Sequence, residues 1–251
     1  MSFAKPLTLR PQPDGAVPPT AMLLAAGLGK RMRPLTLTRP KPLVEVAGRA
    51  LLDHALDRLR GAGVSHAVVN VHYLADNLEA HLARTDQRMR ISISDERAQL
   101  LETGGGLMHA LPLIDADPFL IVNSDNLWVD GPVDSLRMLG RHWDDARMDA
   151  LLLLVPLARA NSHSGRGDFH MDRDGRIARR KAGRVAPFVY TGVQIVSKRL
   201  LVDAPSGPFS FNFFWDRAIA SGRCFGASHQ GLWFDVGTPP AVAATAAVIG
   251  G

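Results

Sequence analysis

Short apolar runs alternate with segments of helical periodicity between residues 20 and 155, and this alternation constrains the fold more than any other feature. The runs at 21–26, 66–71, 119–122 and 150–155 have the length and continuity of buried strands, and residues 90–94 are predicted to form a further strand. The segments at 50–60, 76–84, 104–113 and 132–142 lie between them and are predicted to be helices. The pattern predicts an α/β fold with a Rossmann-like mixed, mostly parallel sheet flanked by helices. In such sheets, ligands bind at the carboxyl ends of the strands.

The second half of the chain departs from this alternation. A hairpin is predicted at 169–180 around Asp174-Gly175, followed by a strand at 188–196, a helix at 209–220, a strand at 232–236 and a closing helix at 239–249. We interpret these elements as a β-rich subregion added to the same domain. Residues 1–19 contain five prolines and no periodic apolar pattern, so we expect a flexible tail at 1–19 and one domain at 20–251.

Composition excludes several classes of protein. With 46% hydrophobic and 21% charged residues, the chain is typical of a globular protein rather than a disordered or fibrous one. Its longest aliphatic run, at 150–155, is far shorter than the ~20 residues of a membrane-spanning helix. The single cysteine forms no internal disulfide, and no apolar signal-peptide core is visible. We therefore expect a cytoplasmic protein with no membrane partner.

The chain is basic, with a net charge of +5 and a pI of about 9.9. Part of this excess is concentrated between residues 166 and 184, where seven arginine and lysine residues stand against three aspartates. This stretch is either a solvated hairpin or a positive rim that attracts phosphorylated small molecules. A nucleic-acid partner is not expected, because aromatic residues for base stacking are scarce there.

The first predicted strand runs into a glycine-rich loop, L-A-A-G-L-G-K-R-M-R-P-L-T at residues 24–36. Glycines at a strand end let backbone N–H groups approach an anion, and a following helix adds its positive end. The loop is not a dinucleotide fingerprint, because Met32 stands where the third glycine is required. It is not a P-loop either, because Leu24 replaces the first glycine and Arg31 replaces the Ser or Thr that binds magnesium.

Four cations accompany this loop: Lys30, Arg31, Arg33 and, slightly later, Lys41. Such a concentration suits a nucleoside triphosphate, because the charge on a leaving pyrophosphate must be neutralised. Pro40 and Pro42 flank Lys41 and restrict the backbone on both sides of it.

Two aspartates follow predicted apolar strands. Asp125 comes after the strand at 119–122, and Asp235 comes at the end of the strand at 232–236. If the two strands are parallel neighbours, both carboxylates point into one crevice, where they could bind Mg²⁺. The alternative is that each aspartate only caps the following turn.

These motifs resemble the signature of the sugar-1-phosphate nucleotidyltransferases. The run at 24–36, followed by Lys41-Pro42-Leu43, matches L-A-A-G-x-G-x-R-M-x-P-L-T and K-P-L at every fixed position. The segments N-S-D-N-L-W at 123–128 and W-F-D-V-G-T-P at 233–239 resemble the family's two magnesium-binding segments, with Ser124 in place of the usual glycine. The resemblance implies that the nucleoside triphosphate binds at Ala25, Gly27, Gly29, Lys30, Arg31 and Lys41, with Arg31 and Lys41 catalytic. It also implies that Asp125 and Asp235 bind Mg²⁺.

Two further segments concern the base and the sugar. Glu102-Thr103-Gly104, which begins an E-T-G-G-G run, offers bare glycine backbone against which a base could lie. This form and the G-D-F at 167–169 are similar to the bacterial N-acetylmuramate α-1-phosphate uridylyltransferases. The resemblance implies sugar-phosphate contacts at Asn123, Asp168, Lys181, Thr191 and Gly192.

We therefore expect an enzyme that joins a sugar α-1-phosphate to a nucleoside triphosphate, releasing pyrophosphate. The favoured substrates are N-acetylmuramate 1-phosphate and UTP, in cell-wall recycling. Mannose-1-phosphate guanylyltransferase activity and a non-catalytic nucleotide-sugar sensor remain alternatives. The expected state is a monomer or a weak homodimer.

Overall fold

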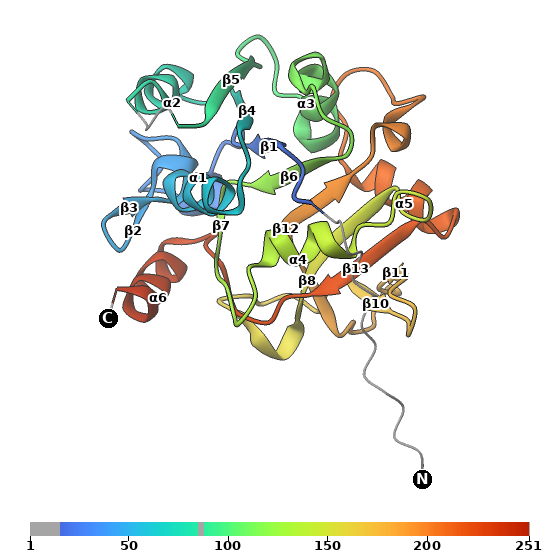
Figure 1. The fold of residues 1–251 in the computed structure, drawn as a ribbon. Coiled ribbons are helices and arrows are strands. Elements are labelled where there is room, and N and C mark those ends of the chain that lie inside the picture. Colours follow the sequence, from blue (N-terminus) through green and yellow to red (C-terminus); the bar gives the residue numbers. More distant parts are fainter. Residues whose placement is uncertain (1–15, 85–87, 251) are drawn as a thin grey trace.

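The computed structural model describes residues 16–84 and 88–250, and its centre is one mixed sheet (Figure 1). Seven strands follow the order β11-β10-β12-β6-β1-β4-β5, and β8 and β13 extend the sheet beside β12. The strands are β1 (Thr20–Leu24), β4 (His66–Val71), β5 (Arg90–Asp95), β6 (Phe119–Asn123), β8 (Ala150–Pro156), β10 (Phe169–Met171), β11 (Ile177–Arg179), β12 (Phe188–Val196) and β13 (Cys224–Ser228). β1 pairs in parallel with β4 and β6, and β12 is antiparallel to both β6 and β8. The predicted mostly parallel sheet is confirmed.

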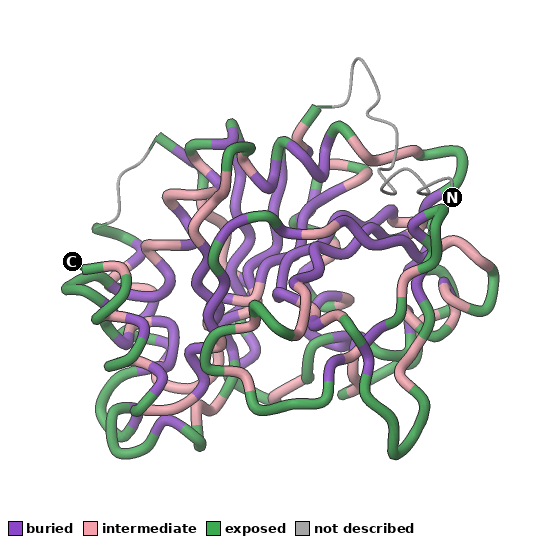
Figure 2. Tube along the Cα trace, turned by 90° about the horizontal axis from the view of Figure 1, so that it is seen from below, coloured by how far each residue is buried: buried purple, intermediate pink, exposed green. Residues whose placement is uncertain are grey.

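The described residues form six helices. The first five cover the two faces of the sheet, because alternate residues of each strand point to opposite sides, whereas the sixth packs against the short strands Glu45–Val46 and Leu232–Asp235. The helices are α1 (Leu51–Ala62), α2 (Ala75–Leu82), α3 (Glu102–Ala110), α4 (Ser135–His142), α5 (Asn212–Ala220) and α6 (Pro239–Ile249). Ala21 and Leu23 pack with α1, α2 and α4, whereas Met22 packs with α3 and α5. Figure 2 shows the buried strands lying inside a shell of exposed loops and outer helix faces.

A second, smaller sheet was not expected from the sequence. It contains β7 (Asn126–Val129), β14 (Leu232–Asp235) and β9 (Ala160–Asn161), in the order β7-β14-β9. A hairpin of β2 (Glu45–Val46) and β3 (Arg49–Ala50) lies beside α6 (Figure 1). Of these strands, only β14 was predicted, as the strand at 232–236. The others have two to four residues, too few for a periodic signal, and the five-residue β13 was also missed.

Residues 16–19, which the sequence assigned to the tail, contact the folded domain. Of the expected tail, residues 1–15 lie outside the described part of the structure, but residues 16–19 belong to the fold. The carbonyl of Ala16 approaches α4 so closely that a Cβ on Gly140 would lie 2.7 Å from it. The carbonyl of Pro19 accepts hydrogen bonds from the backbone of Ser65 and His66.

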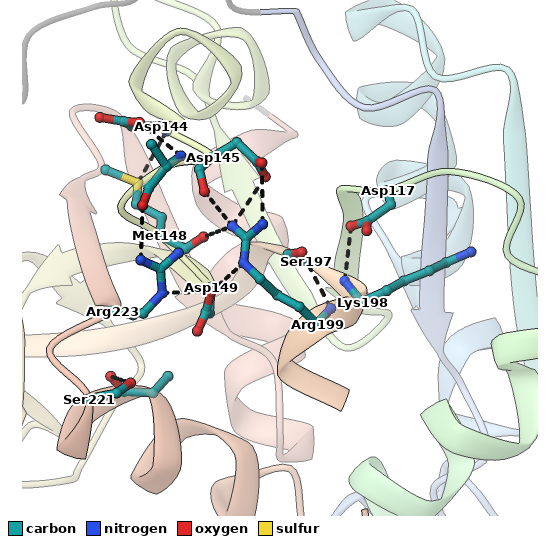
Figure 3. Close-up of polar contacts among 12 residues, drawn as sticks. Asp117, Asp144, Asp145, Met148, Asp149, Ser197, Lys198, Arg199, Ser221 and Arg223 are labelled. Carbon is teal, nitrogen blue, oxygen red and sulfur yellow. Dashed lines mark hydrogen bonds and ion pairs between the residues drawn. The ribbon is translucent and has the colours of Figure 1, made fainter. Parts of the chain in front are cut away.

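An ionic cluster fixes the loop before β8 to the ends of its two neighbouring strands (Figure 3). Asp149 accepts hydrogen bonds from Arg199 at 2.6 Å and from Arg223 at 2.9 Å. Arg199 also contacts Asp145 and the carbonyl of Met148. The cluster therefore joins β8, β13 and the 3-10 turn Lys198–Leu201 (η5) through side chains remote in sequence.

Among residues 16–84 and 88–250, no helix is long and apolar enough to cross a membrane.

Candidate active site

The glycine-rich loop leaves the end of β1 and folds back on itself. The backbone N–H of Ala25 donates to Asn70 Oδ1 at 2.6 Å, and Thr36 Oγ1 donates to the carbonyl of Gly29 at 2.8 Å. Gly29 has a positive φ of 60°, and a Cβ there would lie 2.9 Å from Thr36 and 3.1 Å from Lys41. Glycine is therefore required by both backbone conformation and space. Gly27 is exposed, and an added Cβ would meet no atom within 4 Å, so the loop surface is open at this point.

The loop is not followed directly by an α-helix. Lys30 and Arg31 lie instead on a single 3-10 turn, Lys30–Met32 (η1), and both are exposed. A turn of three residues provides no significant helix dipole. The positive potential of the loop therefore comes from its side-chain cations and free N–H groups.

Lys41 lies on a second 3-10 turn, Lys41–Leu43 (η2), and its ammonium forms an ion pair with Asp125. The Lys41 side chain is only 11% exposed, whereas that of Asp125 is 32% exposed. The lysine is thus packed beside the glycine loop with its charge directed at the predicted metal-binding carboxylate.

Asp125 and Asp235 are brought near each other by a different strand arrangement from the one that we predicted. β6 and β14 are not parallel neighbours, since they belong to different sheets. Asp125 occupies the turn between β6 and β7, and the next residue, Asn126, pairs with Asp235 across the antiparallel β7–β14 ladder. Because the chain reverses after β6, Asp125 lies one residue before the position that pairs with Asp235.

The turn that carries Asp125 is attached to the end of β1. Ser124 is buried, and its hydroxyl and backbone N–H both bond to the carbonyl of Leu24, at 2.8 and 3.2 Å. The serine that departs from the family pattern therefore points into the protein and not toward a ligand.

The arginine of the glycine loop reaches the same place. A Cβ on Gly237 would lie 3.0 Å from Asp235 Oδ1 and 3.3 Å from Arg31 Nη2, so the glycine separates these two groups. Arg31, Lys41, Asp125 and Asp235 thus surround one site, although they come from four separate segments. Its two half-exposed carboxylates provide the oxygen donors that Mg²⁺ prefers, and their exposure leaves room for the waters that Mg²⁺ retains.

The E-T-G-G-G segment begins α3, but its glycines do not offer bare backbone to a base. A Cβ on Gly104 would lie 2.5 Å from the ring of Phe209, and one on Gly105 would lie 2.4 Å from the carbonyl of Gly207. Thr103 Oγ1 accepts a hydrogen bond from the N–H of Phe211. These residues hold α3 against the segment before α5, which corrects the physical reason we gave for them. Glu102 remains exposed, with a positive φ of 59°.

A buried polar chain connects this segment to the glycine loop, and sequence reasoning missed it. Asn70, which holds Ala25, donates to Glu96 Oε1 at 2.6 Å, and Glu96 Oε2 accepts from the N–H of Leu101 at 3.2 Å. Both side chains are buried. The sequence signal for this chain is the position of the two polar residues, since Asn70 lies near the end of β4 and Glu96 directly follows β5.

The predicted sugar-side residues are only partly brought together. Gly192, at φ 87°, lies against Asn123 and Asn126, which flank the turn of Asp125. Thr191 is wholly buried and its hydroxyl donates to the carbonyl of Leu153, so its side chain does not face the site. Asp168 accepts from the N–H of Tyr190 at 2.9 Å. Lys181 is exposed just after β11.

Tyr190 is a second residue that the sequence did not identify. Burial raises the pKa of its phenol well above the usual value, and the negative charge of Asp125 raises it further. The hydroxyl is buried without a partner among the described residues. The phenol therefore remains neutral near the predicted metal-binding carboxylate.

Several cations of the basic stretch are engaged by the protein itself. Arg179 lies over the rings of Phe169 and Trp215 and forms an ion pair with Asp216 at 2.8 Å. Arg180 donates to the carbonyl of Gly167 at 2.9 Å. These two arginines are therefore bound by protein groups, and the structure does not decide between a solvated hairpin and a positive rim for the stretch as a whole.

Comparison with known proteins agrees with this geometry. Residues 20–181 match the family model described as nucleotidyl transferase. The chain belongs to this family. The nucleotidyltransferase is 48% identical over 227 residues to N-acetylmuramate alpha-1-phosphate uridylyltransferase of Caulobacter vibrioides, covering 89% of this chain and 94% of that protein.

More distant relatives share less of their length or only the fold. Mannose-1-phosphate guanylyltransferase catalytic subunit beta of Xenopus tropicalis is 31% identical, over 87% of this chain but 61% of its own. The solved structure of the inositol-1-phosphate CTP transferase from T. maritima superposes with a TM-score of 0.73 at 18% identity, covering 92% of this chain and 96% of that one. This nucleotidyltransferase thus has the fold that such enzymes share.

Proposed function

We propose that this nucleotidyltransferase transfers a uridylyl group from UTP to N-acetylmuramate α-1-phosphate, releasing pyrophosphate, and that it acts in cell-wall recycling in the cytoplasm. The observation that carries the reaction class is the meeting of Arg31, Lys41, Asp125 and Asp235 beside the glycine loop. The substrate assignment is supported by the near-complete coverage of the Caulobacter relative.

In the proposed reaction, an oxygen of the sugar phosphate attacks the α-phosphorus of UTP. The new phosphorus–oxygen bond forms as the bond to the β-phosphate oxygen breaks, and pyrophosphate leaves with that electron pair. The chain's own groups align the two substrates and neutralise charge, with no covalent intermediate on the enzyme. Arg31 and the free N–H groups of the loop stabilise the departing pyrophosphate, and Lys41 stabilises charge at the α-phosphate.

Asp125 and Asp235 would hold Mg²⁺. When bound, Mg²⁺ supplies positive charge that polarises the reacting phosphate. The ammonium of Lys41 forms an ion pair with Asp125. We infer that this ion pair helps to hold the two segments of the site together.

The proposal is tested by measuring pyrophosphate release with Mg²⁺ for UTP, GTP, dTTP and CTP, each paired with a panel of sugar 1-phosphates. Release with UTP and N-acetylmuramate 1-phosphate supports it. Release only with GTP and mannose 1-phosphate replaces it with guanylyl transfer, and no release despite nucleotide binding replaces it with a sensor. Sedimentation of the same sample tests the expected monomer or weak homodimer.

A further inference from the structure

Asp235 has a neighbour that neither the family motifs nor the strand pattern singled out. His163 lies two residues after β9, and its Nδ1 is 3.4 Å from Asp235 Oδ2. The His163 side chain is 16% exposed, and its ring lies against Trp233 with centroids 6.1 Å apart. The imidazole is therefore enclosed between the sheet and the carboxylate.

The opposite nitrogen of this ring is buried without a partner. Nε2 contacts no hydrogen-bonding group among the described residues, and a Cβ on Gly165 would lie 2.4 Å from it. Because Nδ1 alone has a partner, the contacts place the ring proton on Nδ1, from which it is donated to Asp235. A buried nitrogen without a partner has an energetic cost that an apolar ring would avoid. Packing alone does not explain a histidine here.

The backbone fixes His163 to the strand that carries Asp235. Asn161 pairs with Phe234 in the parallel β9–β14 ladder, and its side chain donates to the carbonyl of Trp233 at 2.9 Å. Ser162 adopts a positive φ of 59°, which turns the chain back toward the ladder. The β9–β14 pairing therefore places the segment of His163 beside the strand that carries Asp235.

The two oxygens of Asp235 consequently have different surroundings. Oδ2 faces the Nδ1 of His163, whereas Oδ1 faces Gly237 and, beyond it, the guanidinium of Arg31. A donor on one oxygen fixes the rotation of the carboxylate and leaves the other oxygen to accept a cation.

We propose that His163 is a positioning residue, whose Nδ1–H orients Asp235 to receive the divalent cation on the side of the glycine loop. This inference rests on the proposed metal site at Asp125 and Asp235. Loss of such an outer partner typically weakens metal binding by about 10–100-fold.

The test uses Mn²⁺ alone as the probe, with the dissociation constant measured by electron paramagnetic resonance of the free ion. His163→Phe keeps an aromatic ring but removes the donor, and we expect Mn²⁺ to bind at least about 10-fold more weakly. His163→Asn places an amide N–H near the position of Nδ1 and should restore binding to within about threefold. In turnover assays, the Phe variant should raise the Mg²⁺ concentration required for half-maximal rate more than it raises the KM for UTP.

A second variant keeps the histidine and displaces it. Gly165→Ala should also weaken Mn²⁺ binding, because its Cβ occupies the space beside Nε2. The matched control is Gly61→Ala on α1, where an added Cβ meets no atom within 4 Å, and its Mn²⁺ affinity should equal that of the wild type. Comparing Gly165→Ala with Gly61→Ala therefore tests the role of His163 even if the His163→Phe variant does not fold.

The outcomes separate this inference from the function on which it rests. If Asp235→Asn abolishes Mn²⁺ binding while His163→Phe and Gly165→Ala bind as the wild type does, the role of His163 is refuted and the metal site stands. If His163→Asn binds as weakly as His163→Phe, the donor is not what matters and the inference is overturned. If the wild type and Asp235→Asn bind Mn²⁺ equally, the proposed metal site itself fails.

Discussion

The substitution Lys41→Met separates the chemistry of the site from its stability. The Lys41 side chain is 11% exposed and that of its partner, Asp125, is 32% exposed, so water reaches one side of the ion pair. A pair that is open to water contributes about 1 kcal/mol or less to stability. Methionine keeps the aliphatic stem that packs beside Gly29 and removes a charge that is costly to bury. The free energy of unfolding should therefore change by no more than about 1 kcal/mol.

Turnover should respond much more strongly. Without the ammonium, charge that develops on the reacting phosphate is not neutralised, and we expect a loss of at least ~10²-fold, or about 2.7 kcal/mol of transition-state stabilisation. Divalent cation binding should not weaken, because removing a neighbouring positive charge leaves Asp125 more negative.

The assay is pyrophosphate release at saturating Mg²⁺, with urea unfolding followed by circular dichroism on the same preparations. Lys198→Met is the matched control, since Lys198 donates to the carbonyl of Ile114, the residue after η3 (Leu111–Leu113), outside the glycine loop and the two metal-binding segments. Turnover of Lys41→Met within tenfold of the wild type refutes the role we assign to this lysine. So does an equal loss in the control.

Three further predictions concern the fold. Asp149→Ala removes the acceptor shared by Arg199 and Arg223, and because those arginines are partly solvated we expect the free energy of unfolding to fall by only about 2 kcal/mol; unchanged urea midpoints would contradict this. Burial raises the pKa of the Cys224 thiol to about 12. The native protein should therefore not react with Ellman's reagent until it unfolds. Prompt labelling of the native protein at pH 8 would contradict this, because it would show that Cys224 becomes accessible without unfolding. Burial lowers the pKa of His229, so the unfolded chain binds this proton more tightly than the folded protein. Stability should therefore fall as the pH drops below about 6.5, and His229→Gln should lose less stability between pH 7.5 and 5.5 than the wild type does.

The sequence by itself determined the class of fold and most of the chemistry. Strand and helix periodicities are local properties of the chain, and they predicted the parallel sheet of β1, β4, β5 and β6. The glycine loop, Lys41 between two prolines, and the aspartates after apolar strands could be read directly, because each motif occupies a few consecutive residues.

Only the tertiary structure decided how these pieces meet. Asp125 and Asp235 are 110 positions apart, and an antiparallel pairing of two four-residue strands joins them where we expected parallel neighbours. Phe209 and Gly207 occupy the space beside the glycines of α3, and no local sequence pattern could indicate this contact. The role that we propose for His163 could not be predicted either, because it depends on a contact with Asp235, which lies 72 positions later in the chain. Local backbone preferences act within a few residues, whereas these contacts depend on which distant segments share a core, and that is settled only when the whole domain packs.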